Sequence, residues 1–63
     1  MRYTQGQKVL VRDFEGAKFK RFVWKDEGEL VFVTSERVLK ELREGVSHLF
    51  AVPVPRSDVQ AVN

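Results

Sequence analysis

The segment that decides the fold is residues 18–34, KFKRFVWKDEGELVFVT. It contains the only tryptophan and three of the five phenylalanines of the chain. At its middle, DEGE at residues 26–29 is a turn sequence. Gly28 takes a positive φ without strain, and Asp26 can accept a hydrogen bond from its own backbone two residues later. Because residues that favour strands flank this turn on both sides, the segment predicts a β-hairpin.

The register of the hairpin follows from its turn. A two-residue loop at 27–28 or a four-residue loop at 26–29 places Trp24 opposite Val31 and Phe22 opposite Val33. Since side chains alternate along a strand, these four residues form one wholly apolar face. The other face is mixed and carries Arg21, Val23, Lys25, Leu30, Phe32 and Thr34. One wholly apolar face and one mixed face predict a bent sheet with another element covering part of the mixed face.

Residues 35–45 are predicted to form an amphipathic helix. Thr34 or Ser35 is a suitable N-cap, and Gly45 suits the position just after the last turn. Apolar residues recur at helical spacing, and this stripe consists of Val38, Leu39, Leu42 and Val46. The stripe is the expected cover for Val23, Leu30 and Phe32 on the mixed face.

Further strands are expected on both sides of these elements. Residues 8–12 are strand-like, with Val9 and Val11 on one face and Lys8, Leu10 and Arg12 on the other. The short connection at 16–17 makes this strand an antiparallel neighbour of the hairpin. Residues 47–52 are interpreted as a fourth strand, which Pro53 and Pro55 exclude from a central position. Residues 55–59 predict a tight helical turn. The predicted core consists of Val9, Val11, Phe22, Trp24, Val31, Val33, Val38, Leu42, Phe50, Val52 and Val59.

Two stretches give the chain a resemblance to SH3-like barrels. VLVRDFEG at residues 9–16 resembles their opening strand, which runs into an acidic and aromatic step. PRSDV at residues 55–59 resembles their closing proline, single 3₁₀ turn and valine-led last strand. The members that bind proline-rich peptides carry a long acidic loop and a tryptophan pair. Residues 14–19 leave no room for such a loop and Trp24 stands alone, so polyproline recognition is not expected.

These patterns predict one domain over residues 1–63, of the α+β class and mostly β. The expected architecture is a small, strongly bent antiparallel sheet or SH3-like barrel in the order β-β-β-α-β, with one amphipathic helix at residues 35–45. With 43% apolar and 32% charged residues, the composition is that of a soluble globule with a thin core. The chain has no cysteine, no apolar run of about 20 residues and no signal-peptide pattern. The expected location is therefore the cytoplasm, without a membrane partner.

Positive charge is concentrated in the first part of the chain. Residues 1–25 carry seven basic and two acidic side chains, whereas residues 26–63 carry four basic and seven acidic ones. Basic side chains interleaved with aromatic ones are typical of sheets that bind nucleic acid. The candidate residues are Lys8, Arg12, Lys18, Lys20, Arg21 and Lys25. Alternation puts Lys18 and Lys20 on one face and Arg21 and Lys25 on the other unless the strand bulges, and such lysines also serve to protect a sheet edge.

The favoured hypothesis is a small non-enzymatic interaction module that docks a protein partner, or a second copy of itself as a homo-oligomer. Its candidate contact residues are Arg21, Lys25, Leu30 and Phe32, which combine apolar and basic groups on the mixed face. Nucleic-acid binding is the alternative. No catalytic residue, cofactor, metal site or small-molecule substrate is expected. His48 is the only histidine, and the chain contains no phosphate-binding loop or nucleophile motif.

Overall fold

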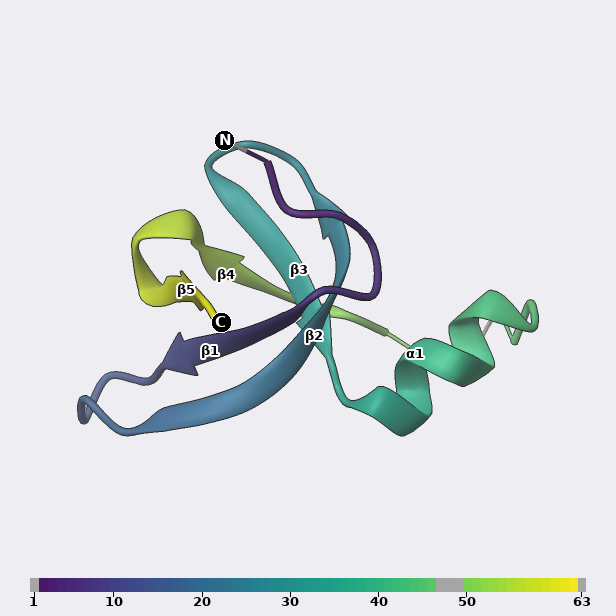
Figure 1. The fold of residues 1–63 in the computed structure, drawn as a ribbon, viewed down its shortest axis with the longest axis horizontal. Helices are drawn as coiled ribbons and strands as arrows, with labels where there is room; N and C mark the ends of the chain where they lie inside the picture. Colours follow the sequence, from purple (N-terminus) through teal and green to yellow (C-terminus); the bar gives the residue numbers. More distant parts are fainter. Residues whose placement is uncertain (1, 47–49, 63) are drawn as a thin grey trace.

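A computed structural model describes residues 2–46 and 50–62 of the chain. Its elements, in chain order, are β1 (Lys8–Arg12), β2 (Lys18–Asp26), β3 (Leu30–Thr34), α1 (Glu36–Arg43), β4 (Val52–Pro55), the 3₁₀ turn η1 (Arg56–Asp58) and β5 (Val59–Ala61). The five strands form one antiparallel sheet in the order β4-β3-β2-β1-β5 (Figure 1). The prediction of a small α+β domain, mostly β and with one helix, is confirmed.

The sheet bends about its longest strand, β2, and encloses a core made of valines. β2 pairs with β1 over residues 18–22 and with β3 over residues 22–26. The buried cluster consists of Val9, Val23, Val31, Val33 and Val59, with Tyr3, Val11 and Val54 packed against it. Cross-strand partners point to the same side of a sheet. We call the side that carries this cluster the core side and the opposite side the outer side.

The predicted register of the β2–β3 hairpin is wrong. Val23 lies opposite Val33, but the register then shifts and Lys25 lies opposite Phe32. Trp24 is left without a cross-strand partner of its own, which is the arrangement of a β-bulge. The strands are joined by residues 27–29, and the Glu27 amide donates a 2.9 Å hydrogen bond to the Leu30 carbonyl. As a result Val23 is completely buried, while Trp24 is only half-buried.

The predicted core is correct at four valines and wrong at two later positions. Val9, Val31, Val33 and Val59 are buried, as predicted. Phe50 is 82% exposed and Val52 is 60% exposed. Val52 begins β4, which is an edge of the sheet formed by the described residues. The remaining predicted core residues are half-buried: Val11, Phe22, Trp24, Val38 and Leu42. Leu39 and Thr34 are also buried, although the predicted core did not include them.

The end of the sheet follows the prediction in part. The strand predicted at residues 47–52 begins at Val52, and residues 47–49 lie outside the described residues. Pro53 and Pro55 lie within β4, an edge strand, so their exclusion from a central position is confirmed. The predicted helical turn is η1, and Val59 returns to the core directly after it.

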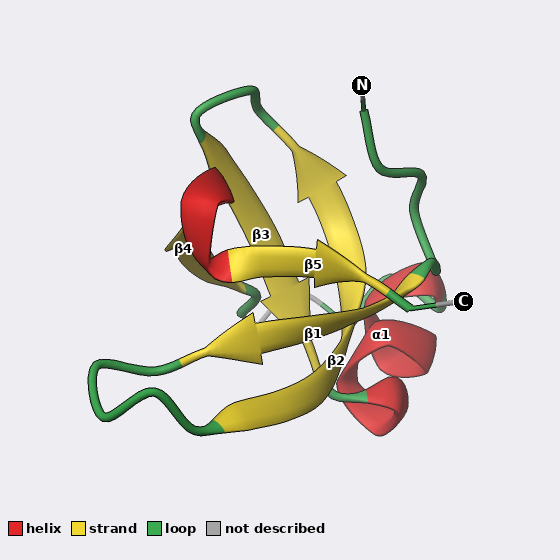
Figure 2. Ribbon diagram, turned by 60° about the vertical axis from the view of Figure 1, so that its left-hand side comes forward, coloured by secondary structure: helices red, strands yellow, loops and turns green. Residues whose placement is uncertain are grey.

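Helix α1 begins and ends where its capping residues predict. The Ser35 side-chain oxygen accepts a 3.2 Å hydrogen bond from the Val38 amide, and Gly45 has a φ of +89°. The helix packs against β2, on the opposite side of the molecule from η1 (Figure 2). The prediction that the helix covers Leu30 is wrong: Leu30 is 43% exposed. The helix instead lies over Phe22, which the register shift turns to the outer side.

A polar clasp ties the hairpin tip to the N-terminal segment and to η1. The Asp26 carboxylate, whose side chain is 3% exposed, accepts hydrogen bonds from the Tyr3 amide at 2.7 Å, from the Gly28 amide at 2.9 Å and from the Arg56 guanidinium. The Arg56 guanidinium also donates to the Gly28 carbonyl and lies 5.4 Å from the centroid of the Tyr3 ring. Figure 1 shows the N-terminal segment reaching this tip. The hydrogen bond between Asp26 and Gly28 confirms the predicted turn chemistry, whereas Arg56 was not predicted as a partner of Asp26.

Acid is expected to weaken the clasp. Hydrogen bonds from Arg56, and then from the amides of Tyr3 and Gly28, hold the pKa of the Asp26 carboxyl well below its ordinary value of 3.8. A carboxyl with a lower pKa in the folded state stabilises that state fully above about pH 5, and the contribution is lost progressively as the pH falls below the unfolded value. We expect the melting temperature of the wild type to fall between about pH 5 and about pH 2. The Asp26→Asn variant should have a lower melting temperature than the wild type at neutral pH, and its melting temperature should change less between about pH 5 and about pH 2. Melting is followed by circular dichroism. The same pH dependence of the melting temperature in both proteins would contradict the role of Asp26.

Candidate nucleic-acid interface

The register between β1 and β2 brings four basic side chains to the outer side of the sheet. Lys8 lies opposite Phe22, Leu10 opposite Lys20, and Arg12 opposite Lys18. The residues between them on β1 are Val9 and Val11, which point to the core. We call this surface the basic face, and it consists of Lys8, Arg12, Lys18 and Lys20, with Leu10 among them.

The basic face is only partly neutralised. Arg12 forms a 3.1 Å ion pair with Asp58, and the Lys18 ammonium donates a 3.2 Å hydrogen bond to the Gln60 side chain. Within residues 2–46 and 50–62, neither Lys8 nor Lys20 forms an ion pair. Like charges directly opposite each other on a sheet are destabilising, and Arg12 faces Lys18 across the β1–β2 pair. A bound polyanion would relieve this repulsion.

The β-bulge adds a fifth cation to the same side, while the sixth candidate lies on the other. The register shift turns Lys25 to the outer side opposite Phe32, where it forms a 3.2 Å ion pair with Glu27. Arg21 lies opposite Val9 and therefore on the core side. Its guanidinium is exposed, 5.6 Å from the centroid of the Phe19 ring, and donates a 2.8 Å hydrogen bond to the Lys20 carbonyl. Of the six nucleic-acid candidates, all except Arg21 share the outer side.

The four docking candidates are also divided by this register. Lys25, Leu30 and Phe32 lie on the outer side, and Arg21 does not. Leu30 and Phe32 line a shallow hollow of about 480 Å³ together with Glu27 and Glu29. Because Lys25 is paired with Glu27, the charge around these apolar side chains is acidic rather than basic. The hollow does not have the mixed apolar and basic character expected from the sequence.

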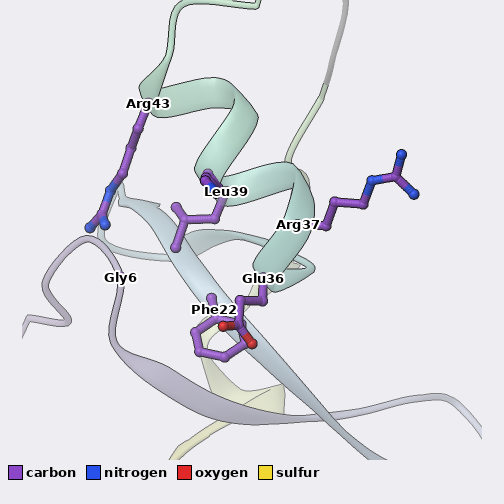
Figure 3. Close-up of a pocket in the computed structure, with 7 residues that line it drawn as sticks. Gly6, Phe22, Glu36, Arg37, Leu39 and Arg43 are labelled. Carbon is purple, nitrogen blue, oxygen red and sulfur yellow. The ribbon is translucent and has the colours of Figure 1, made fainter.

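The sequence did not point to a groove between α1 and β2, at the end of the basic face. This groove has a volume of about 660 Å³, and the apolar side chains Phe22 and Leu39 line it beside Lys40 and Arg43 (Figure 3). It was missed because the predicted register turned Phe22 to the core. A signal for the groove was present in the sequence of the helix. Lys40 and Arg43 are one and four residues after the apolar Leu39, so these cations lie beside it on the helix surface.

Comparison of the chain with protein-family models, with curated proteins and with solved structures finds no match in any of the three. In the described part of the chain, no helix has the length and apolar character needed to cross a membrane. Among the same residues, no three side chains of metal-binding types come together, and His48 lies outside them. The site is therefore interpreted from its own geometry and charge.

Proposed function

We propose that this chain is a small non-enzymatic module that binds nucleic acid by contacting its phosphate backbone with the basic face. The observation that carries the proposal is the β1–β2 register, which aligns Lys8, Arg12, Lys18 and Lys20 on one side of the sheet. Residues two apart on a strand recur at about 6.5 Å, so across the two strands Arg12 with Lys18, then Lys20, then Lys8 form a row of cations at about that spacing. Such a row suits a polymer with one negative charge per monomer.

The proposal includes an SH3-like barrel as the finer description of the fold, and a cytoplasmic location. The strand order, with β5 beside β1, and the 3₁₀ turn between β4 and β5 support the barrel, as does a valine core shared by both halves of the sheet. A fold does not by itself imply a function, and the support for binding comes from the charged side chains.

The salt dependence of binding tests this function. Affinity for a fluorescein-labelled, mixed-sequence RNA strand is measured by fluorescence anisotropy between about 20 and 200 mM NaCl, a range over which phosphate contacts weaken strongly. Four phosphate contacts with a single strand should give a slope of about −3 in a plot of the logarithm of the association constant against the logarithm of the salt concentration. No binding at the lowest salt concentration would overturn the proposal.

Two adjacent residues of β2 provide a matched pair of variants. Lys20→Gln removes a cation of the basic face, and we expect weaker binding with the slope reduced by about one. Arg21→Gln removes one cation from the next position, which faces the core side, and should leave both the affinity and the slope nearly unchanged. Equal effects of the two substitutions would mean that net charge, rather than the basic face, determines binding.

Docking of a protein partner or of a second copy is a second candidate, supported by the exposure of Leu30 beside Phe32. Lys25 lies within the same area, and Arg21 does not contribute to it. Apolar contacts change little with salt, whereas phosphate contacts weaken steeply. The salt titration therefore also separates the two candidate functions.

A further inference from the structure

The groove between α1 and β2 combines an apolar floor with a polar rim. In Figure 3 the Phe22 ring lies below Leu39, with Arg43 at one end beside Gly6 and Glu36 at the other. Leu39 is buried, and Phe22 is half-buried and lines the open space. The volume of about 660 Å³ falls within the range of about 300–1,000 Å³ that small organic groups usually occupy.

The groove is continuous with the basic face. Phe22 lies directly opposite Lys8 and is two residues from Lys20 on the same side of β2. Lys40 adds a further cation at the rim, and within the described residues it forms no ion pair. Arg43 is held at the other end by hydrogen bonds of 3.4 Å to the Gln5 side chain and carbonyl. A ligand that crosses the basic face therefore reaches an aromatic ring with Lys8, Lys40 and Arg43 around it and the Glu36 carboxylate at one end of the groove.

We propose that this groove receives one unpaired base of a single-stranded nucleic acid, which stacks on Phe22 while the adjacent phosphates contact Lys8, Lys40 and Arg43. The inference rests on the proposed function and adds a preference for single strands. A nucleobase has apolar faces and a polar edge, which match an apolar floor and a polar rim. In a duplex the bases are stacked and paired, so none enters the groove without being flipped out.

Charge also distinguishes this ligand from an acidic peptide. The rim cations of the groove meet the row of cations on β1 and β2, so that positive charge extends well beyond the groove itself. A peptide would need acidic residues repeated along its whole length to use that row. A single strand supplies one phosphate per nucleotide together with the base that fills the groove.

The test compares a twelve-nucleotide single strand with the duplex of the same sequence in the same buffer. We expect the wild type to bind the single strand roughly tenfold more tightly, which is the usual size of one aromatic stacking contact. Phe22→Leu should remove that preference and leave duplex binding unchanged. Phe19→Leu is the matched control, since Phe19 lies on the same strand but opposite Val11 on the core side.

A second pair of variants leaves the half-buried Phe22 ring in place, so that packing of the sheet is not changed. Lys40→Gln should weaken binding of the single strand more than Arg21→Gln, because Lys40 lines the groove and Arg21 lies on the core side of the sheet. Equal affinity for both nucleic acids, with no effect of Phe22→Leu or Lys40→Gln, would overturn this inference and leave the proposed function standing. Absence of binding to either nucleic acid would overturn both. Equal competition by a polyglutamate of the same charge would replace the base with an acidic peptide and overturn the inference.

Discussion

The Arg56→Ala variant is expected to melt roughly 10 °C or more below the wild type, since one kilocalorie per mole shifts the melting temperature of a domain this small by several degrees. Arg56 bonds both the Asp26 carboxylate and the Gly28 carbonyl, and it covers the Tyr3 ring. The variant leaves the buried Asp26 charge without its cation. Removing one partner of a buried ion pair is far more costly than breaking an exposed one, because the remaining charge is not solvated. Thermal melting at pH 7 followed by circular dichroism measures the effect.

Arg12→Ala is the matched control for this variant. It breaks another arginine–aspartate pair, in which the Arg12 and Asp58 side chains are 54% and 32% exposed. Exposed pairs contribute little to stability, so a shift of no more than a few degrees is expected. Similar losses for Arg56→Ala and Arg12→Ala would contradict a special role for the clasp.

The Val23→Ala variant is expected to lose about 2–3 kcal/mol of the free energy of unfolding, because it removes buried methyl groups and leaves a cavity. Val23 is completely buried at the centre of the valine cluster. A chain of 63 residues has a total stability of roughly 3–9 kcal/mol, so the loss is a large share of it. Urea unfolding followed by tryptophan fluorescence measures the change.

Val52→Ala makes the same chemical change at a position that is 60% exposed. Its expected cost is within about 0.5 kcal/mol, as for most surface substitutions. Val52 lies opposite Val33 at the sheet edge, so both variants probe the same sheet. A larger loss at Val52 than at Val23 would mean that the register of the hairpin is not the one described.

The helix and the turns were predictable because their signals are local. The Ser35 side-chain oxygen caps the start of α1, and Gly45 after its end has a positive φ, which glycine adopts easily because it has no Cβ. The prolines restrict β4 to an edge for an equally local reason, since proline has no amide hydrogen to donate. Each of these predictions depends on a few adjacent residues.

The hairpin faces were not predictable, because a bulge leaves no trace in the alternation of residues 22–25, FVWK. Each residue from Phe22 to Trp24 suits either face, and the choice depends on how Val23 packs with valines of other strands. The same shift determined where the cations lie, moving Lys25 to the outer side and leaving Arg21 on the core side. The partnership of Asp26 with Arg56 spans 30 residues and was likewise invisible to local reasoning.

The two edge strands of the sheet limit how another extended chain can pair with it. Pro53 and Pro55 are two residues apart on β4, so their backbone nitrogens face the same lateral edge of the strand, and neither has an amide hydrogen to donate there. The other edge, β5, is only three residues long. An approaching extended chain therefore finds no continuous ladder of donors and acceptors on β4 and little length on β5. Neither edge of the sheet is therefore a good template for a further strand, so we expect a concentrated solution of this protein to resist fibre formation.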